Sequence, residues 1–91
     1  MPVQVHVTSV IQSAVNGQKT FEADGGTIAA LLDDIERRYP GFRSSIADAD
    51  GKLHRFVNIY LNDEDIRFLS GTETALKSGD AVSILPALAG G

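Results

Sequence analysis

The sequence predicts a single α+β domain, a mixed sheet of four to five strands with one main helix across one face. The chain has 91 residues, which is room for one compact domain. Near the N-terminus, valines alternate with polar residues in the pattern of a half-buried strand. One long apolar stripe with helical spacing follows, and then several short apolar runs. Strands on both sides of one helix are typical of α+β domains.

The N-terminal part of the chain is predicted to form a hairpin. Three β-branched valines on one face indicate a first strand at residues 3–8. Asn16-Gly17 is a strong turn signal, so the chain is expected to return as a second strand over residues 18–22. Residues 10–15 are expected to widen the loop of this hairpin.

The main helix is predicted to begin after Thr27, whose side chain can cap the first turn. Pro40-Gly41 is expected to end it, because proline cannot continue a helix and glycine commonly follows one. Charged side chains occupy the face opposite the apolar stripe. The apolar residues at helical spacing are Ile28, Leu31, Leu32, Ile35 and Tyr39.

The second half of the chain alternates turn signals with short apolar runs. A strand is expected wherever apolar residues alternate, and a turn wherever Gly, Asp and Asn gather. Pro86 is expected to stop regular pairing. The expected order is a helical turn at 42–47, a turn at 48–52, a strand at 55–61, a polar turn at 62–65, a short return strand at 66–68, a helical turn at 72–76, a turn at 77–80 and a last strand at 81–85.

This order of elements matches the ubiquitin-like β-grasp arrangement. In that arrangement the first and last strands pair in parallel at the centre of the sheet, and the helix is part of the long crossover between them. Residues 1–86 are therefore predicted to form the domain, and residues 87–91 a flexible C-terminal tail.

Composition excludes several classes of function. The 8 Lys and Arg residues are outnumbered by 12 Asp and Glu residues, and Arg37-Arg38 stands beside acidic residues, so there is no basic stripe for nucleic acid. An acidic surface also disfavours anionic membranes. The chain has no Cys, which excludes disulfides and thiolate metal sites. With no secretory signal or apolar membrane span in the sequence, a cytoplasmic location is expected.

The segment after the last predicted strand carries the chemistry. Residues 86–91 hold no side chain for acid–base or nucleophilic work, so the reactive group is the α-carboxylate of Gly91. Gly90 has no Cβ, and with Leu88 and Ala89 it is expected to thread a narrow channel in a partner's active site. Six extended residues reach at most about 20 Å.

An ionised carboxylate is a poor electrophile and needs activation before a nucleophile can attack it. The chain lacks a GxxxxGK[ST] phosphate loop, so a partner must supply ATP and adenylate Gly91. A sulfur donor can then convert the acyl adenylate to a thiocarboxylate, which is a good nucleophile. No internal thiol competes for the activated acyl group.

Three stretches of the sequence are shared with a known family. Residues 79–86 read GDAVSILP and are followed by a short spacer and Gly90-Gly91, residues 56–67 read FVNIYLNDEDIR, and residues 27–32 read TIAALL. The chain resembles, over essentially its whole length, the ThiS/MoaD family of ubiquitin-like sulfur carriers. The second half is most similar to the CysO-type branch, which serves cysteine biosynthesis.

The resemblance implies a set of partners. An adenylyltransferase and sulfurtransferase of the MoeB/MoeZ type would activate Gly91 and install sulfur. A pyridoxal-phosphate-dependent cysteine synthase of the CysM type would use the thiocarboxylate, and a zinc peptidase would release cysteine. The protein is then expected to have no catalytic activity alone, to hold no bound cofactor and to be a monomer.

Other functions remain open on the sequence. Within the family, the chain could be the small subunit of molybdopterin synthase or a carrier for thiazole synthesis. A third alternative is a ubiquitin-like modifier that forms isopeptide bonds through Gly91, and a fourth is an interaction domain with an idle tail.

The second half also offers a candidate docking surface. Its aromatic members either form an exposed patch or pack against the turns, and its arginines flank an acidic turn that is expected to be solvated. His6 and His54 are expected to be surface residues rather than metal ligands. The docking candidates are Arg55, Phe56, Tyr60, Arg67 and Phe68.

Overall fold

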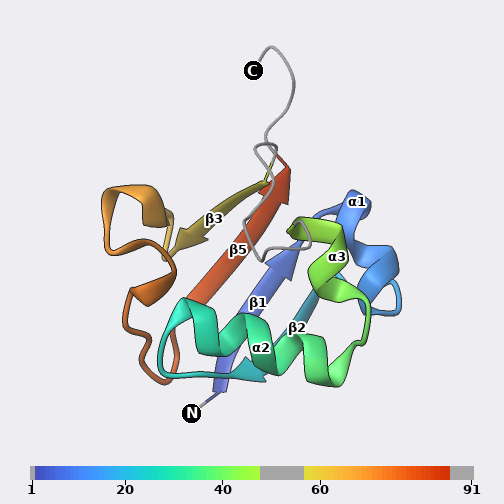
Figure 1. Ribbon diagram of the computed structural model, residues 1–91, viewed down its shortest axis with the longest axis horizontal. Helices are drawn as coiled ribbons and strands as arrows, with labels where there is room; N and C mark the ends of the chain where they lie inside the picture. The colour runs from blue at the N-terminus through green and yellow to red at the C-terminus, as the bar shows by residue number, and fades with distance from the viewer. Residues whose placement is uncertain (1, 48–56, 87–91) are drawn as a thin grey trace.

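The computed structural model describes residues 2–47 and 57–86, which form a mixed five-stranded sheet with a helix lying across one face (Figure 1). Short 3₁₀ turns connect several of the elements. In chain order the elements are β1 (Pro2–Val7), α1 (Ser9–Gln12), η1 (Ser13–Val15), β2 (Thr20–Asp24), α2 (Ile28–Arg38), α3 (Phe42–Ile46), β3 (Val57–Leu61), β4 (Glu64–Asp65), η2 (Ile66–Phe68), η3 (Gly71–Glu73) and β5 (Ala81–Pro86).

The sheet has the strand order β2-β1-β5-β3-β4. β1 and β5 are parallel neighbours at its centre, with Gln4 opposite Ala81 and Val7 opposite Ile84. The pairs β1–β2, β3–β5 and β3–β4 are antiparallel. This confirms the predicted central parallel pair.

The core lies between the sheet and α2. The three alternating valines of β1 are at most 5 % exposed, and the apolar stripe of α2 belongs to the same hydrophobic cluster. Phe42 and Ile46 of α3 are also buried, and α3 falls within the predicted helical turn at 42–47. The fully buried side chains of the two central strands and α2 include Val3, Val5, Ile28, Leu31, Ile35, Val82 and Ile84.

Local side-chain contacts set both ends of α2. The Thr27 hydroxyl oxygen accepts a hydrogen bond from the amide of Ala30 at 3.1 Å, as expected of an N-cap. Beyond the other end, the Glu36 carboxylate accepts hydrogen bonds from the amides of Gly41 at 3.0 Å and Arg43 at 2.7 Å. These contacts, with Gly41 at a φ of 101°, turn the chain from α2 into α3.

Gly25 lies against the first turn of α2. A Cβ atom at this position would sit 2.5 Å from the backbone nitrogen of Leu31 and 2.7 Å from its Cα. A Cβ on Gly26 would meet no atom within 4 Å. The close approach of β2's end to α2 therefore requires glycine at position 25 but not at position 26.

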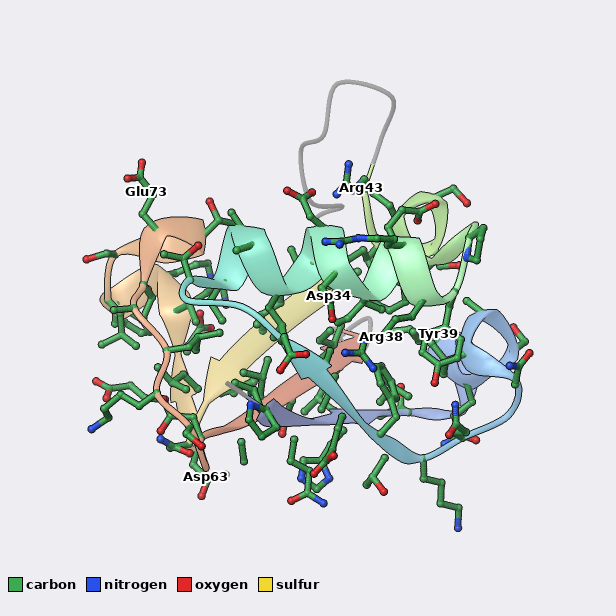
Figure 2. The ribbon with its side chains drawn as sticks, turned by 90° about the horizontal axis from the view of Figure 1, so that it is seen from below. Asp34, Arg38, Tyr39, Arg43, Asp63 and Glu73 are labelled. Atoms are coloured by element: carbon green, nitrogen blue, oxygen red, sulfur yellow. The ribbon has the colours of Figure 1, made fainter. Side chains whose placement is uncertain are left out.

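A charged cluster covers part of the outer edge of β2. Asp34 of α2 accepts a hydrogen bond from the amide of Asp24 at 2.8 Å, and Arg38 bridges Asp34 at 2.7 Å and Asp24 at 2.9 Å. Figure 2 shows Asp34 and Arg38 beside the strand. The Asp24 amide, followed by Arg38, holds the pKa of Asp34 below its ordinary value. Covering an edge amide in this way hinders pairing with another chain.

The structure corrects two predictions in the second half. The return strand is Glu64–Asp65, and Ile66–Phe68 forms a 3₁₀ turn instead of a strand. The reason is that the Asp65 side chain accepts a hydrogen bond from the amide of Arg67 at 2.8 Å, which stabilises a local turn. The last strand extends one residue further than predicted, because Pro86 belongs to β5 and lies opposite Val57; whether pairing stops after it stays a prediction. A proline keeps its carbonyl acceptor and is tolerated at a strand end.

The predicted N-terminal hairpin is also modified. β2 begins at Thr20, two residues later than expected, because the Gln18 amide group donates to the Val15 carbonyl at 2.9 Å and to the Tyr39 hydroxyl at 2.8 Å. The residues expected to widen the loop form the helical turns α1 and η1. The predicted turn at residues 48–52 lies outside the described residues.

Candidate functional site

The predicted reactive tail begins where β5 ends. Gly91, Gly90, Ala89 and Leu88 lie outside the described residues, so their predicted role stays a prediction. The structure fixes their attachment point, because β5 pairs with β1 on one side and with β3 on the other. At the end of β5, Pro86 lies opposite Val57. At most about 17 Å of extended chain separates Pro86 from the terminal carboxylate.

The alternation of β5 explains how its end is held. Val82 and Ile84 point into the core and are 0 % exposed. Ser83 and Leu85, on the opposite face, are half-buried. Ile84 lies opposite Val7 of β1 and Ile59 of β3, so the strand is packed and paired on both sides. The tail is therefore attached to the centre of the sheet.

The start of β5 is fixed by a polar pair. The Asp80 carboxylate accepts hydrogen bonds from the amide of Lys77 at 2.8 Å and from the Asn62 side chain at 3.1 Å. The Asn62 carbonyl oxygen accepts one from the amide of Ala81 at 3.0 Å. The Lys77 amide, followed by Asn62, holds the pKa of Asp80 below its ordinary value. These contacts set the register of the strand that carries the tail.

Sequence reasoning did not find the contact between Asn62 and Asp80. The Gly-Asp pair at positions 79 and 80 was noted only as a shared motif and a turn. Its physical role is now clear, since Gly79 has a φ of 91° and Asp80 accepts the bonds that begin β5. No sequence pattern links Asp80 to a residue 18 positions away, whereas the β3–β5 pairing brings the two together.

The predicted docking residues fall into two groups. Arg55 and Phe56 lie outside the described residues. Tyr60 is half-exposed and pairs with Asp65 across β3 and β4, while the Arg67 guanidinium contacts Asp65 at 2.6 Å. Phe68 is 80 % exposed. The structure thus places Tyr60 and Arg67 beside one carboxylate, and whether they dock a partner stays a prediction.

The described residues present no candidate metal centre. In residues 2–47 and 57–86, no group of three or more His, Cys, Asp and Glu side chains is placed to hold a metal ion. His6 is half-buried on the open face of the sheet, opposite Ser83 and Thr20, and His54 lies outside the described residues. None of the described helices has the length and hydrophobicity that a membrane crossing requires.

One hollow lies beside α2. It has a volume of about 200 Å³ and is lined by Ala29, Leu32, Thr72 and the ion pair of Asp33 with Arg43. Sites for small ligands usually span about 300–1,000 Å³ and enclose most of the ligand. This hollow is smaller than that range, so it does not qualify as a cofactor site.

Comparison with known proteins assigns the family. The profile of the ThiS family matches residues 5–91. The chain belongs to the ThiS family. It is 47 % identical over 93 residues to the sulfur carrier protein CysO of Mycobacterium tuberculosis, with all of both chains covered. It is also 37 % identical over 80 residues to small archaeal modifier protein 3 of Haloferax volcanii, covering 85 % of this chain and 86 % of that protein.

Solved structures show the same fold in this family. The crystal structure of M. tuberculosis CysO has a TM-score of 0.88 at 45 % identity, covering 94 % of this chain and 99 % of that one. A chain from the crystal structure of the Amycolatopsis orientalis BexX/CysO complex also has a TM-score of 0.88, at 43 % identity, covering 98 % and 99 %. The ThiS-family chain is therefore a ubiquitin-like β-grasp domain and a homologue of CysO, as predicted.

Proposed function

We propose that this ThiS-family protein is a sulfur carrier for cysteine biosynthesis, whose C-terminal Gly91 is converted to a thiocarboxylate by a partner enzyme. The observation that carries this proposal is the 47 % identity to a sulfur carrier protein over the whole chain. The family match also extends to Gly91, the last residue. In the sequence a three-residue spacer joins the Gly-Gly terminus to β5, a strand held at the centre of the sheet.

The proposed chemistry uses the terminal carboxylate and a partner's ATP. A carboxylate oxygen of Gly91 attacks the α-phosphorus of ATP, and pyrophosphate leaves. A donor at the oxidation level of sulfide then attacks the acyl carbon, and AMP leaves with the oxygen that it gained. One oxygen of the carboxylate is replaced by sulfur. In this proposal both steps take place in the partner's active site, and the protein acts as a co-substrate rather than an enzyme.

The proposed partners follow from this chemistry and from the family. A MoeB/MoeZ-type enzyme would adenylate Gly91 and transfer sulfur, a CysM-type pyridoxal-phosphate enzyme would accept the sulfur, and a zinc peptidase would release cysteine. The BexX/CysO complex of A. orientalis supports docking as the mode of action, because a similar carrier is crystallised there with a second protein. A cytoplasmic location and a monomeric state also stay predictions.

Mass spectrometry of the protein from its native host tests the proposal. Replacing one oxygen atom by sulfur raises the mass of the protein by the same nominal amount as oxidising Met1. The mass increase must therefore be mapped to the C-terminal fragment and confirmed with a thiol-reactive tag. We expect the tag on Gly91, and none on a chain truncated after Ala89. An untagged carboxylate at Gly91 in cells that are starved of cysteine would refute the proposal.

A second candidate function is protein modification. The similarity to small archaeal modifier protein 3 favours it, because a modifier also uses its C-terminus. Peptides in which the Gly91 carbonyl is joined to lysine side chains of other proteins would support this function. Capture of a molybdopterin synthase large subunit or a thiazole synthase, without a cysteine synthase, would instead favour the other sulfur-carrier roles.

A further inference from the structure

A large aromatic side chain is exposed at the β4 edge of the sheet. Phe68 exposes 80 % of its surface, and the next residue, Leu69, exposes 38 %. They are the exposed large hydrophobic residues of the part of the chain that the structure describes. Burying a phenylalanine side chain is favourable, because its apolar surface leaves water. This free energy is not gained in the isolated domain and is available to a partner.

The backbone around Phe68 is held in place. Residues 66–69 form what we call the Phe68 knob. At one end Ile66 is 3 % exposed, and its carbonyl accepts a hydrogen bond from the amide of Leu69 at 3.0 Å. Asp65 is 8 % exposed and accepts hydrogen bonds from the amide, Nε and Nη2 of Arg67. An exposed aromatic residue on a fixed turn loses little conformational entropy on binding, as the anchor residues of interfaces do.

The chain after the knob is fixed in the same way. The Thr74 hydroxyl accepts a hydrogen bond from the amide of Ser70 at 3.0 Å and donates one to the Gly71 carbonyl at 2.7 Å. Thr74 itself is 8 % exposed. The Phe68 knob is therefore preorganised from both sides.

The surroundings of the Phe68 knob are acidic. Residues 62–76 contain four acidic residues and one basic residue, a formal charge of 1 − 4 = −3, and the base, Arg67, is already paired with Asp65. Asp63 and Glu73, both exposed, lie on opposite sides of this end of the molecule (Figure 2). A second copy of the chain would place like charges together, whereas a pocket rimmed by Lys or Arg complements this surface.

The Phe68 knob lies away from the end of β5. β3 runs from Val57, opposite Pro86, to Leu61, opposite Val82, and β4 follows it. Four steps along a strand span about 13 Å. An enzyme that takes the tail into its active site can therefore contact the knob only at a second, separate place.

We propose that the Phe68 knob is the recognition anchor for the enzyme that activates Gly91, inserted into an apolar pocket of that enzyme with Lys or Arg at its rim. This inference rests on the proposed function. The tail has no charged or hydrogen-bonding side chain of its own, so an enzyme that selects this carrier must read its folded part.

The test is steady-state ATP–pyrophosphate exchange by the MoeB/MoeZ-type enzyme of the native host with the full-length protein. We expect Phe68→Ser to raise KM for the carrier about tenfold or more, with kcat within about twofold, because the knob binds but does not react. Phe68→Leu, which keeps an apolar side chain, should raise KM much less than Phe68→Ser does. Glu73→Lys should raise KM by an amount that shrinks as salt increases, because it opposes the basic rim.

Each outcome decides a different question. No exchange with the wild-type protein would refute the proposed function, whereas exchange in which Phe68→Ser keeps the wild-type KM would overturn only the anchor. Analytical ultracentrifugation of the free protein tests whether a second copy of the chain, rather than the enzyme, binds the Phe68 knob. A wild-type dimer that dissociates in Phe68→Ser would assign the knob to self-association and overturn the proposal. Unchanged denaturation midpoints would show that the substitutions leave the fold intact, as the exposure of Phe68 predicts.

Discussion

Replacing Gly25 with alanine should destabilise the domain strongly, while the same change at Gly26 should not. A Cβ at position 25 would lie 2.5 Å from the Leu31 nitrogen and 3.0 Å from the carbonyl carbon of Ala30. These are backbone atoms of α2 and cannot rotate away. To restore an ordinary contact of 3.4 Å, the helix must retreat by 3.4 − 2.5 = 0.9 Å.

A shift of that size disturbs the core, because α2 contributes four buried apolar side chains to it. A gap of 0.5–1 Å forfeits about a quarter to a half of each van der Waals contact. Overpacking typically lowers the free energy of unfolding by about 1–3 kcal/mol. Because Gly25→Ala clashes with backbone atoms, we expect its loss to be about 3 kcal/mol. Small domains have about 5–15 kcal/mol of stability in total, so the loss is large but leaves the protein folded.

Urea denaturation measures the effect. With a slope of about 1.5 kcal/mol per molar, a loss of about 3 kcal/mol lowers the midpoint by about 2 M. Gly26→Ala is the matched control, because its Cβ meets no atom within 4 Å and its φ is not in the left-handed region. It should leave the midpoint unchanged or raise stability by about 0.5 kcal/mol through the unfolded state. Equal midpoints for the two variants would refute the reasoning.

Three further predictions concern single side chains. Thr27→Ala should lower the free energy of unfolding, measured by chemical denaturation, by about 1 kcal/mol, because the N-cap of α2 is lost. Thr27→Ser should keep most of this stability, because serine retains the capping hydroxyl. Asp63→Gly should add about 0.5 kcal/mol, because Asp63 has a φ of 74°; a lower midpoint would contradict this. The pKa values of Asp34 and Asp80 are lowered in the folded state, so their stabilisation is present above the unfolded value of about 4 and is lost as pH falls below it. Denaturation midpoints should fall as the pH drops below the unfolded value, and less steeply in Asp80→Asn.

The elements that the sequence predicted well are those with long, regular patterns. The apolar stripe of α2 spans three turns and begins at a Thr cap, so local signals and burial agree. The alternating valines of β1 allow one register, because a slip by one residue would expose all three. The central pairing of β1 with β5 followed from the order of the elements.

The errors arose where a side chain competed with the sheet. Ile66 and Phe68 alternate like strand residues, yet a single carboxylate, that of Asp65, captures the amide of Arg67 and closes a turn. In this turn Ile66 is buried in the core and Phe68 is exposed, whereas in a strand the two side chains would lie on the same face. Whether a short segment pairs or turns depends on such contacts, which periodicity does not reveal.

The candidate site was predicted in part. The assignment of the terminal carboxylate of Gly91 as the reactive group comes from the sequence and stays a prediction, because the tail lies outside the described residues. How the tail is supported did not follow, because the contact of Asn62 with Asp80 depends on the pairing of β3 with β5. The exposure of Phe68 was left open between two alternatives and needed the structure.

The position of β5 between two neighbours also has a mechanical consequence. When an enzyme grips the terminus of a carrier, tension passes along the chain into this strand. Two flanking ladders share that load in shear, since both run along the direction of pulling. An outer strand such as β2 would instead peel away one bond at a time. A pull on the C-terminal end of β5 would thus load two ladders rather than one, and the domain should resist fraying from this strand.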